Sequence, residues 1–97
     1  MWRHGDVLIA VGEAIPPEAR RCQSVVLAYG EVTGHSHRVE EPKKAEMWEY
    51  RGERFLNLTA PTRIMHEEHH PIPLGAGIYR VWQQREYTPE AIRHILD

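Results

Sequence analysis

The chain has 97 residues, of which 41% are hydrophobic and 27% charged, and this balance is typical of one globular domain spanning 1–97. A formal net charge of −2 excludes a general attraction to phosphate backbones or anionic lipids, so any recognition of nucleic acid has to be local. The single cysteine, Cys22, excludes an intramolecular disulfide and a metal site made of paired thiols. The first apolar run, 6–11, is too short and too polar at its flanks for a signal peptide or a membrane span, so we expect a cytoplasmic protein that does not enter membranes.

Three strands are predicted in the first half of the chain. Residues 6–11 form a short apolar run rich in β-branched side chains, which is typical of a buried strand. Residues 23–29, with Val25, Leu27 and Tyr29 on one face, predict a second strand. Gly30 then permits a bend before a third predicted strand, 32–40.

The middle of the chain predicts a β-hairpin followed by another strand. Residues 46–50 and 54–59 are rich in aromatic and aliphatic side chains and flank the dipeptide Arg51-Gly52, which is suited to a tight turn. Residues 62–66 then resume an extended pattern.

The last part of the chain predicts a turn, a strand and a helix. Residues 71–77, rich in proline and glycine, have the composition of a turn, and residues 78–87 are the longest strand candidate. Thr88 as N-cap and Pro89 in the first turn predict a short C-terminal helix over 89–96. The expected fold is therefore mainly β: a small antiparallel β-barrel or sandwich with a short C-terminal helix.

Five of the seven histidines lie in two short clusters, 35–38 and 66–70. In an extended strand the side chains of residues i and i+2 point to the same side. His35 and His37 are therefore expected to direct two imidazoles toward one point. The plainer alternative is that both are strand histidines whose ring nitrogens are satisfied by ordinary hydrogen bonds.

The second cluster, 66–70, has two geometric interpretations. On a strand, His66, Glu68 and His70 would share one face, whereas on a turn His66 and His69 would converge. The prolines that follow favour the turn and also exclude the helical zinc-protease motif. A solvated, charge-rich turn without chemical function is the plainer alternative.

Neutral imidazole is the commonest protein ligand for transition metals. Histidines contributed by both clusters are enough for a metal site that keeps an open position. The predicted ligands from the clusters are His35, His37, His66 and His69. Glu67 or Glu68 would orient a ligand or act as the base for a metal-bound water, and Arg38 would bind developing negative charge. Residue type alone does not separate Zn, Mn, Fe and Ni as the divalent metal.

Residues 30–41 resemble the first motif of the cupins, in which a glycine, an H-x-H pair and a glutamate come from one bent strand. The resemblance implies that His35, His37 and Glu41 are metal ligands, with Glu40 as a less well-spaced candidate. It also implies a cupin-like barrel.

Two features depart from the cupin pattern. The glycine lies one residue closer to His35 than is usual, and the second motif is met only by 73–75, with Ile78 where a ligand histidine would stand. A further ligand would then come from the second histidine cluster.

Three longer segments, G-E-V-T-G-H-x-H-R, H-E-E-H-x-P-I and G-x-Y-R-V-x-x-Q-R-E-Y, are similar to those of a group of small uncharacterised bacterial and phage proteins. This resemblance covers most of the chain and implies that the two clusters act together. It implies participation of His66 and His69 rather than His70.

Three functions remain open at this point. The first is a metal-dependent enzyme, a hydrolase, acting on a small-molecule or nucleotide substrate. The second is a metal-independent nuclease or phosphodiesterase that cleaves RNA or cyclic nucleotides by histidine and glutamate acid-base catalysis, with Arg38 on the developing charge. The third is a non-catalytic protein-interaction module. A homodimer would protect the edges of so small a sheet.

Overall fold

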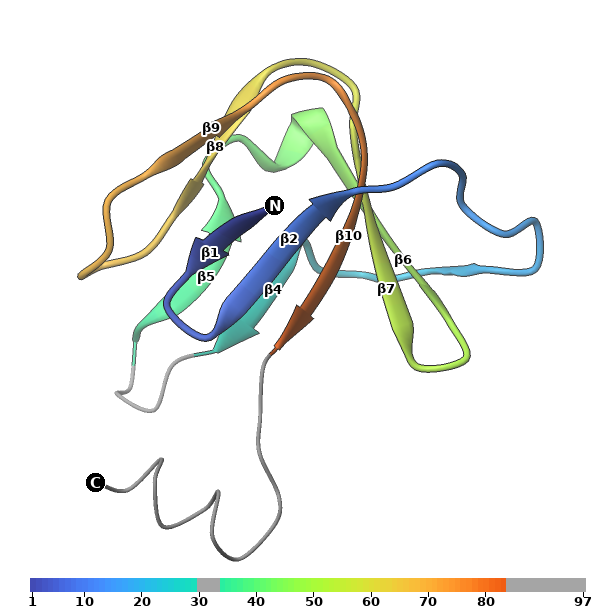
Figure 1. Ribbon diagram of the computed structural model, residues 1–97, viewed down its shortest axis with the longest axis horizontal. Coiled ribbons are helices and arrows are strands. Elements are labelled where there is room, and N and C mark those ends of the chain that lie inside the picture. Colours follow the sequence, from blue (N-terminus) through green and yellow to red (C-terminus); the bar gives the residue numbers. More distant parts are fainter. Residues whose placement is uncertain (30–33, 84–97) are drawn as a thin grey trace, which may run out of the picture.

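A computed structural model describes residues 1–29 and 34–83, which form two antiparallel sheets (Figure 1). The strands of the first sheet are, in spatial order, β1 (Trp2–His4), β2 (Val7–Val11), β10 (Gly77–Gln83), β7 (Glu53–Leu58), β6 (Ala45–Tyr50) and β3 (Arg20–Arg21). The strands of the second sheet are β4 (Val26–Tyr29), β5 (Ser36–Val39), β8 (Thr62–Met65) and β9 (Ile72–Leu74). The two sheets share one core.

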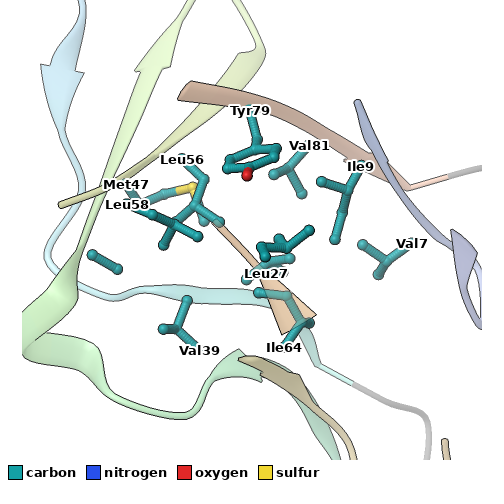
Figure 2. Packing of buried hydrophobic residues seen from close by; sticks show 12 residues of the cluster. Val7, Ile9, Leu27, Val39, Met47, Leu56, Leu58, Ile64, Tyr79 and Val81 are labelled. Carbon is teal, nitrogen blue, oxygen red and sulfur yellow. The ribbon is translucent and has the colours of Figure 1, made fainter. Parts of the chain in front are cut away.

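That core is made of the inward side chains of both sheets (Figure 2). Leu27, Val39 and Ile64 come from the second sheet and belong to the same buried cluster as Ile9 and Leu56 of the first. Burial of such aliphatic side chains is the main favourable term in folding. The prediction of a mainly β antiparallel domain is confirmed, and the sheets in the described residues do not close into a barrel.

The predicted hairpin in the middle of the chain is confirmed. Tyr50 pairs with Glu53, so that β6 and β7 are joined by the two-residue turn Arg51-Gly52. The φ angles of these two residues are 49° and 80°, and this left-handed backbone matches the natural twist of the flanking strands.

A second hairpin, between β1 and β2, is absent from the sequence-based prediction. His4 pairs with Val7 across the turn Gly5-Asp6, and the φ angle of Gly5 is +64°. The strand β1 has only three residues, too few for a recognisable alternation of side chains. Its pairing with β2 places His4 inside the fold.

The turn predicted over 71–77 needs a correction, because it contains the strand β9 (Ile72–Leu74). Pro73 pairs with Arg63 of β8, and β9 is an edge strand with no partner on its other side in the described part of the chain. A proline is tolerated there because its missing amide hydrogen is not needed by a second neighbour.

The ends of several predicted elements differ from the structure. The third strand, predicted over 32–40, is described only as β5 (Ser36–Val39), and a 3-10 turn, Pro42–Lys44, follows it. Residues 84–87 of the last predicted strand and the helix predicted over 89–96 lie outside the described residues. In the described part of the chain there is no helix with the length and apolar content needed to span a bilayer.

Candidate functional site

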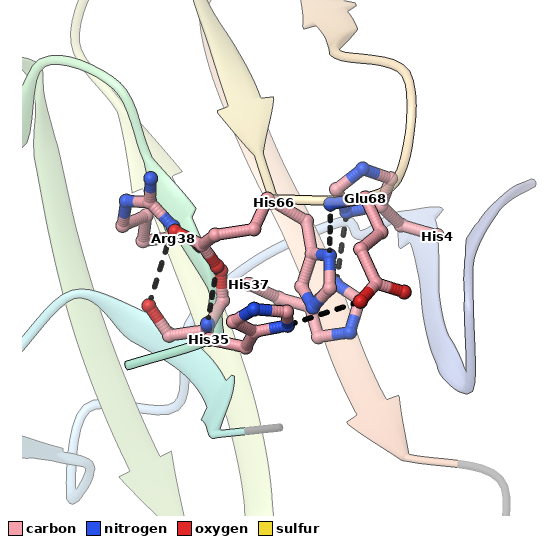
Figure 3. Close-up of polar contacts among 8 residues, drawn as sticks. His4, His35, His37, Arg38, His66 and Glu68 are labelled. Carbon is pink, nitrogen blue, oxygen red and sulfur yellow. Dashed lines mark hydrogen bonds and ion pairs between the residues drawn. The ribbon is translucent and has the colours of Figure 1, made fainter. Parts of the chain in front are cut away.

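The two histidine clusters meet at one end of the second sheet, where β5 and β8 lie side by side (Figure 3). The ring centroids of His37 and His66 are 4.3 Å apart, and those of His66 and His69 are 4.6 Å apart. The ring centroid of His35 lies 5.5 Å from that of His66. The convergence of His66 and His69 predicted for a turn is confirmed.

The pleat of β5 explains why only one histidine of the first cluster is fully buried. His37 and Val39 are each 3% exposed and point into the fold, whereas Ser36 and Arg38 are half-buried on the other face. Because Arg38 pairs with Met65 of β8, the chain that leaves β8 begins the second cluster beside His37.

The residues described by the structure contain two groups of possible metal ligands, each with its ligand atoms within 4.8 Å of one another. One group is His37, His66 and His69, and the other is His35, His66 and Glu67. Bonds of about 2.1 Å to a tetrahedral metal place the ligand atoms about 3.4 Å apart. A short inward movement of the side chains would therefore suffice to close either group on an ion.

A histidine outside both predicted clusters, His4, completes the arrangement from β1. Its Nδ1 lies 2.9 Å from Nδ1 of His37, and its Nε2 lies 3.0 Å from the backbone carbonyl of His70. The ring of His4 is also 5.3 Å from that of His69. His4 thus links the β1 hairpin, β5 and the second cluster.

The environment of these rings favours neutral imidazole. Burial, together with the neighbouring His66 and His4, lowers the pKa of His37 to about 4. Burial also lowers the pKa of His4 and of His66. The neutral form, which has the free lone pair that a metal needs, is therefore the form present at pH 7.

Gly5 forms the surface against which two of the rings lie. A Cβ atom at this position would come within 2.7 Å of Nε2 of His69 and 3.2 Å of Cε1 of His37. The φ angle of +64° is a second reason for glycine here. The tight β1–β2 turn therefore permits an approach of His69 and His37 that any side chain would obstruct.

Asp6, in the same turn, places a carboxylate beside the site. Its Oδ1 lies 3.6 Å from Nε2 of His37, and its Oδ2 accepts a hydrogen bond from the side chain of Gln83. Neither His4 nor Asp6 is among the site residues predicted from the sequence. The available signal was Gly5-Asp6, a dipeptide typical of a two-residue hairpin turn.

Glu67 and Arg38, two of the predicted catalytic residues, bind each other and the backbone of β5. Oε1 of Glu67 accepts a hydrogen bond of 2.9 Å from the amide of Ser36, and Oε2 lies 2.6 Å from Nη1 of Arg38. Arg38 also donates to the carbonyl of Ser36 at 2.8 Å. These contacts attach the second cluster to the first.

The third predicted catalytic residue, Glu68, lies at the outer rim. One of its carboxylate oxygens is 3.5 Å from Nδ1 of His35, and its backbone amide donates a hydrogen bond of 3.0 Å to Nδ1 of His66. The carboxylate is largely exposed to solvent.

Glu41 is the predicted ligand that the structure does not bring to the histidines. It accepts a hydrogen bond from Thr62 at 3.2 Å and pairs with Lys44 at 2.8 Å, and neither ligand group of the described residues includes it. Glu40 is held by Arg63. His70 takes part in the cluster through its carbonyl group.

A family model described as a domain of unknown function, DUF8820, matches residues 3–84, and the chain belongs to this family. The matched region includes every residue of the site, from His4 to His70. Comparison with curated proteins and with solved structures found no match to the chain. The resemblance to the cupins stays a prediction.

Proposed function

We propose that this protein is a metal-dependent hydrolase whose divalent metal is bound by His37, His66 and His69. The observation that carries the proposal is the approach of three imidazoles from two segments far apart in the sequence, with one ligand atom of each within 4.8 Å of the others. Hydrogen bonding within a fold does not by itself require so many imidazoles at one place, whereas a three-histidine metal site does.

The donor set and its exposure fit a catalytic site better than a purely structural one. Catalytic zinc sites typically have three protein ligands and keep a fourth position for water. Here His37 is buried, His66 is half-buried and His69 is exposed, so the ligand group opens to solvent on one side. Nitrogen donors alone favour Zn, Fe or Ni over Mn.

His66 has to change its hydrogen bonding when a metal binds. Its Nδ1 accepts a hydrogen bond from the amide of Glu68, so in the neutral ring the hydrogen is on Nε2. Coordination through Nδ1 would replace the amide, and coordination through Nε2 would require the hydrogen to move from Nε2 to Nδ1, which ends the hydrogen bond from the amide. Because His66 and Glu68 belong to a turn outside the strands, this adjustment does not disturb either sheet.

The surrounding carboxylates then divide into two roles. A bound divalent metal would lower the pKa of a coordinated water to about 7 and so supply the nucleophile. Glu67, which is fixed by Ser36 and Arg38, orients the second cluster. Glu68 and Asp6, both more exposed, are placed to accept a proton at the rim of the site.

The first test is the metal content of protein made without a histidine tag and purified without a nickel column. We expect about one equivalent of metal per chain, lost in His37→Ala and retained in His70→Ala, whose carbonyl remains. Hydrolysis of activated esters and phosphodiesters should then depend on the metal. A metal content near zero, with a melting temperature that chelation leaves unchanged, would contradict the proposal.

The metal-independent nuclease remains as a second proposal because a ring nitrogen of His66, whose pKa is lowered by burial, lies within 4.8 Å of a carboxylate oxygen of Glu67, a pair suited to acid-base catalysis. This enzyme would keep its activity in EDTA and show a bell-shaped pH profile. The metal-dependent proposal is preferred because Arg38 already binds Glu67 and the carbonyl of Ser36. RNA, a nucleotide or another small molecule as substrate, the homodimer and the cytoplasmic location stay predictions.

A third proposal, the non-catalytic interaction module, makes the opposite expectation for the histidines. Alanine at His37 or His66 would then affect neither binding of a partner nor any turnover. Retention of metal by the wild-type protein, together with its loss in these variants, would exclude this third proposal.

A further inference from the structure

His4 is the most deeply buried titratable side chain next to the ligand group, and both of its ring nitrogens are in contact with polar partners. It is 2% exposed, its Nε2 faces the carbonyl of His70 at 3.0 Å, and its Nδ1 faces Nδ1 of His37 at 2.9 Å. The rings of His4 and His37 are nearly perpendicular, at 74°, with their centroids 4.9 Å apart. Figure 3 shows the side chain of His4 close to those of His37 and His66.

The positions of the hydrogens follow from the partners. A carbonyl oxygen only accepts, so Nε2 of His4 must carry a hydrogen. In a neutral ring Nδ1 of His4 is then a lone pair, and the contact with His37 requires Nδ1 of His37 to donate. The second nitrogen of His37, Nε2, then carries the lone pair, and it faces Oδ1 of Asp6 at 3.6 Å, which is too far for a hydrogen bond.

We propose that His4 is a positioning residue that holds His37 in its Nδ1–H form and so presents Nε2 of His37 to the metal. This inference rests on the proposed metal site, and it adds the ligand atom of His37 and the residue that selects it. Metal-binding histidines generally donate their other ring hydrogen to a fixed acceptor, which orients the ring and sets the tautomer. Here the acceptor is a second histidine, itself anchored by a backbone carbonyl.

The fold explains why the acceptor can be an imidazole. His4 is held in β1 by its pairing with Val7, and the carbonyl of His70 belongs to the chain that carries His69. A single ring therefore fixes the orientation of His37 and the position of the segment after the second cluster. A reversed hydrogen between the two Nδ1 atoms would set the lone pair of His4 Nε2 against the lone pairs of the His70 carbonyl.

The first experiment reads the tautomers directly in the metal-free wild-type protein. Long-range 1H–15N spectra at neutral pH distinguish an imidazole with hydrogen on Nδ1 from one with hydrogen on Nε2. We expect His4 as Nε2–H and His37 as Nδ1–H. The inference is overturned if His37 carries its hydrogen on Nε2. This measurement does not depend on whether the protein binds metal, so it separates a failure of the inference from a failure of the proposed function.

The second experiment measures binding of Co²⁺ and Zn²⁺ to three variants. His4→Phe keeps a ring but removes both contacts, and we expect affinity to fall about 10- to 100-fold, as for loss of other groups that support a ligand. His4→Asn keeps an acceptor near Nδ1 of His37 and should retain more of the affinity. His70→Ala keeps the carbonyl and should match the wild type.

The absorption spectrum of bound Co²⁺ reports the geometry of the ligands. A variant that is less stable but still folded would keep this spectrum unless the ligands themselves had moved. An unchanged spectrum and affinity in His4→Phe would overturn the inference. If His4→Phe does not fold, the tautomer spectra of the wild type and of His4→Asn decide. A hydrogen on Nδ1 of His37 in both proteins supports the role of His4, and a hydrogen on Nε2 of His37 in the wild type overturns it.

Discussion

A Cβ atom built on Gly5 would lie 2.7 Å from Nε2 of His69, although the two residues are in different segments of the chain. This approach is closer than van der Waals contact permits, so the position of His69 depends on the absence of a side chain at Gly5. The β1–β2 turn is thereby part of the site and not merely a connection between strands.

We predict that Gly5→Ala weakens metal binding by about tenfold, because the new methyl group displaces His69. The size of this effect is that expected when a group that supports a metal ligand is removed. The control is Gly52→Ala, also at positive φ in a two-residue turn but with no atom within 4 Å of the added Cβ. Both variants should lose about 1 kcal/mol of stability from the left-handed backbone. Equal metal affinity in the two variants would show that Gly5 has no role beyond its turn.

The metal-free protein should lose stability in mild acid. The pKa of His37 falls from 6.5 in the unfolded chain to about 4 in the folded protein, so the unfolded chain takes up the proton first as the pH decreases. The contribution of His37 to the free energy of unfolding should therefore be constant above pH 6.5. It should decrease as the pH is lowered from 6.5 to about 4. One pKa unit corresponds to about 1.4 kcal/mol, which limits the contribution of His37 to about 3 kcal/mol.

The pKa values of His4 and His66 are lowered as well, so these residues change the stability in the same direction. Urea unfolding of metal-free protein at several pH values checks this, and His37→Gln should flatten the dependence. A stability that rises on acidification from pH 6.5 to 4 would contradict the burial of neutral His37.

Three single variants distinguish the two ligand groups. His66 belongs to both groups, His69 only to the first and His35 only to the second. We expect His66→Ala and His69→Ala to weaken Zn²⁺ binding by more than about 100-fold, because loss of a ligand exceeds loss of a supporting contact. His35→Ala should have a much smaller effect. Competition with a metal-sensitive dye measures all three, and the reverse order for His35 and His69 would assign the metal to the second group.

Glu67→Gln should separate orientation of the second cluster from metal ligation. The amide oxygen can still accept from the backbone of Ser36, whereas the ion pair with Arg38 is lost. Because both side chains are partly exposed, we expect only a small loss of stability. Metal affinity should fall less than in His66→Ala. An effect on affinity as large as that of His66→Ala would make Glu67 itself a ligand.

Local sequence patterns predicted those parts of the fold and site that depend on near neighbours. The Arg51-Gly52 hairpin was identified because turn residues lie between two apolar runs. The alternation of buried His37 and Val39 with half-buried Ser36 and Arg38 follows the two-residue period expected of a strand. The convergence of His66 and His69 was predicted from the prolines that deny the segment a regular strand. Strand β9 was missed because Pro73, with Pro71 just before the strand, resembles turn chemistry when the edge position is unknown.

The sequence by itself determined that the chain is mainly β and that its chemistry is carried by two groups of histidines, because strand alternation and ligand type are local properties. Only the tertiary structure decided that His4, Gly5 and Asp6 join them and that Glu41 binds Lys44 and Thr62 instead. The physical reason is that β1 has no pattern of its own. Its position is set by pairing with β2, which brings the start of the chain against residues 37, 69 and 70 through contacts that no local spacing encodes.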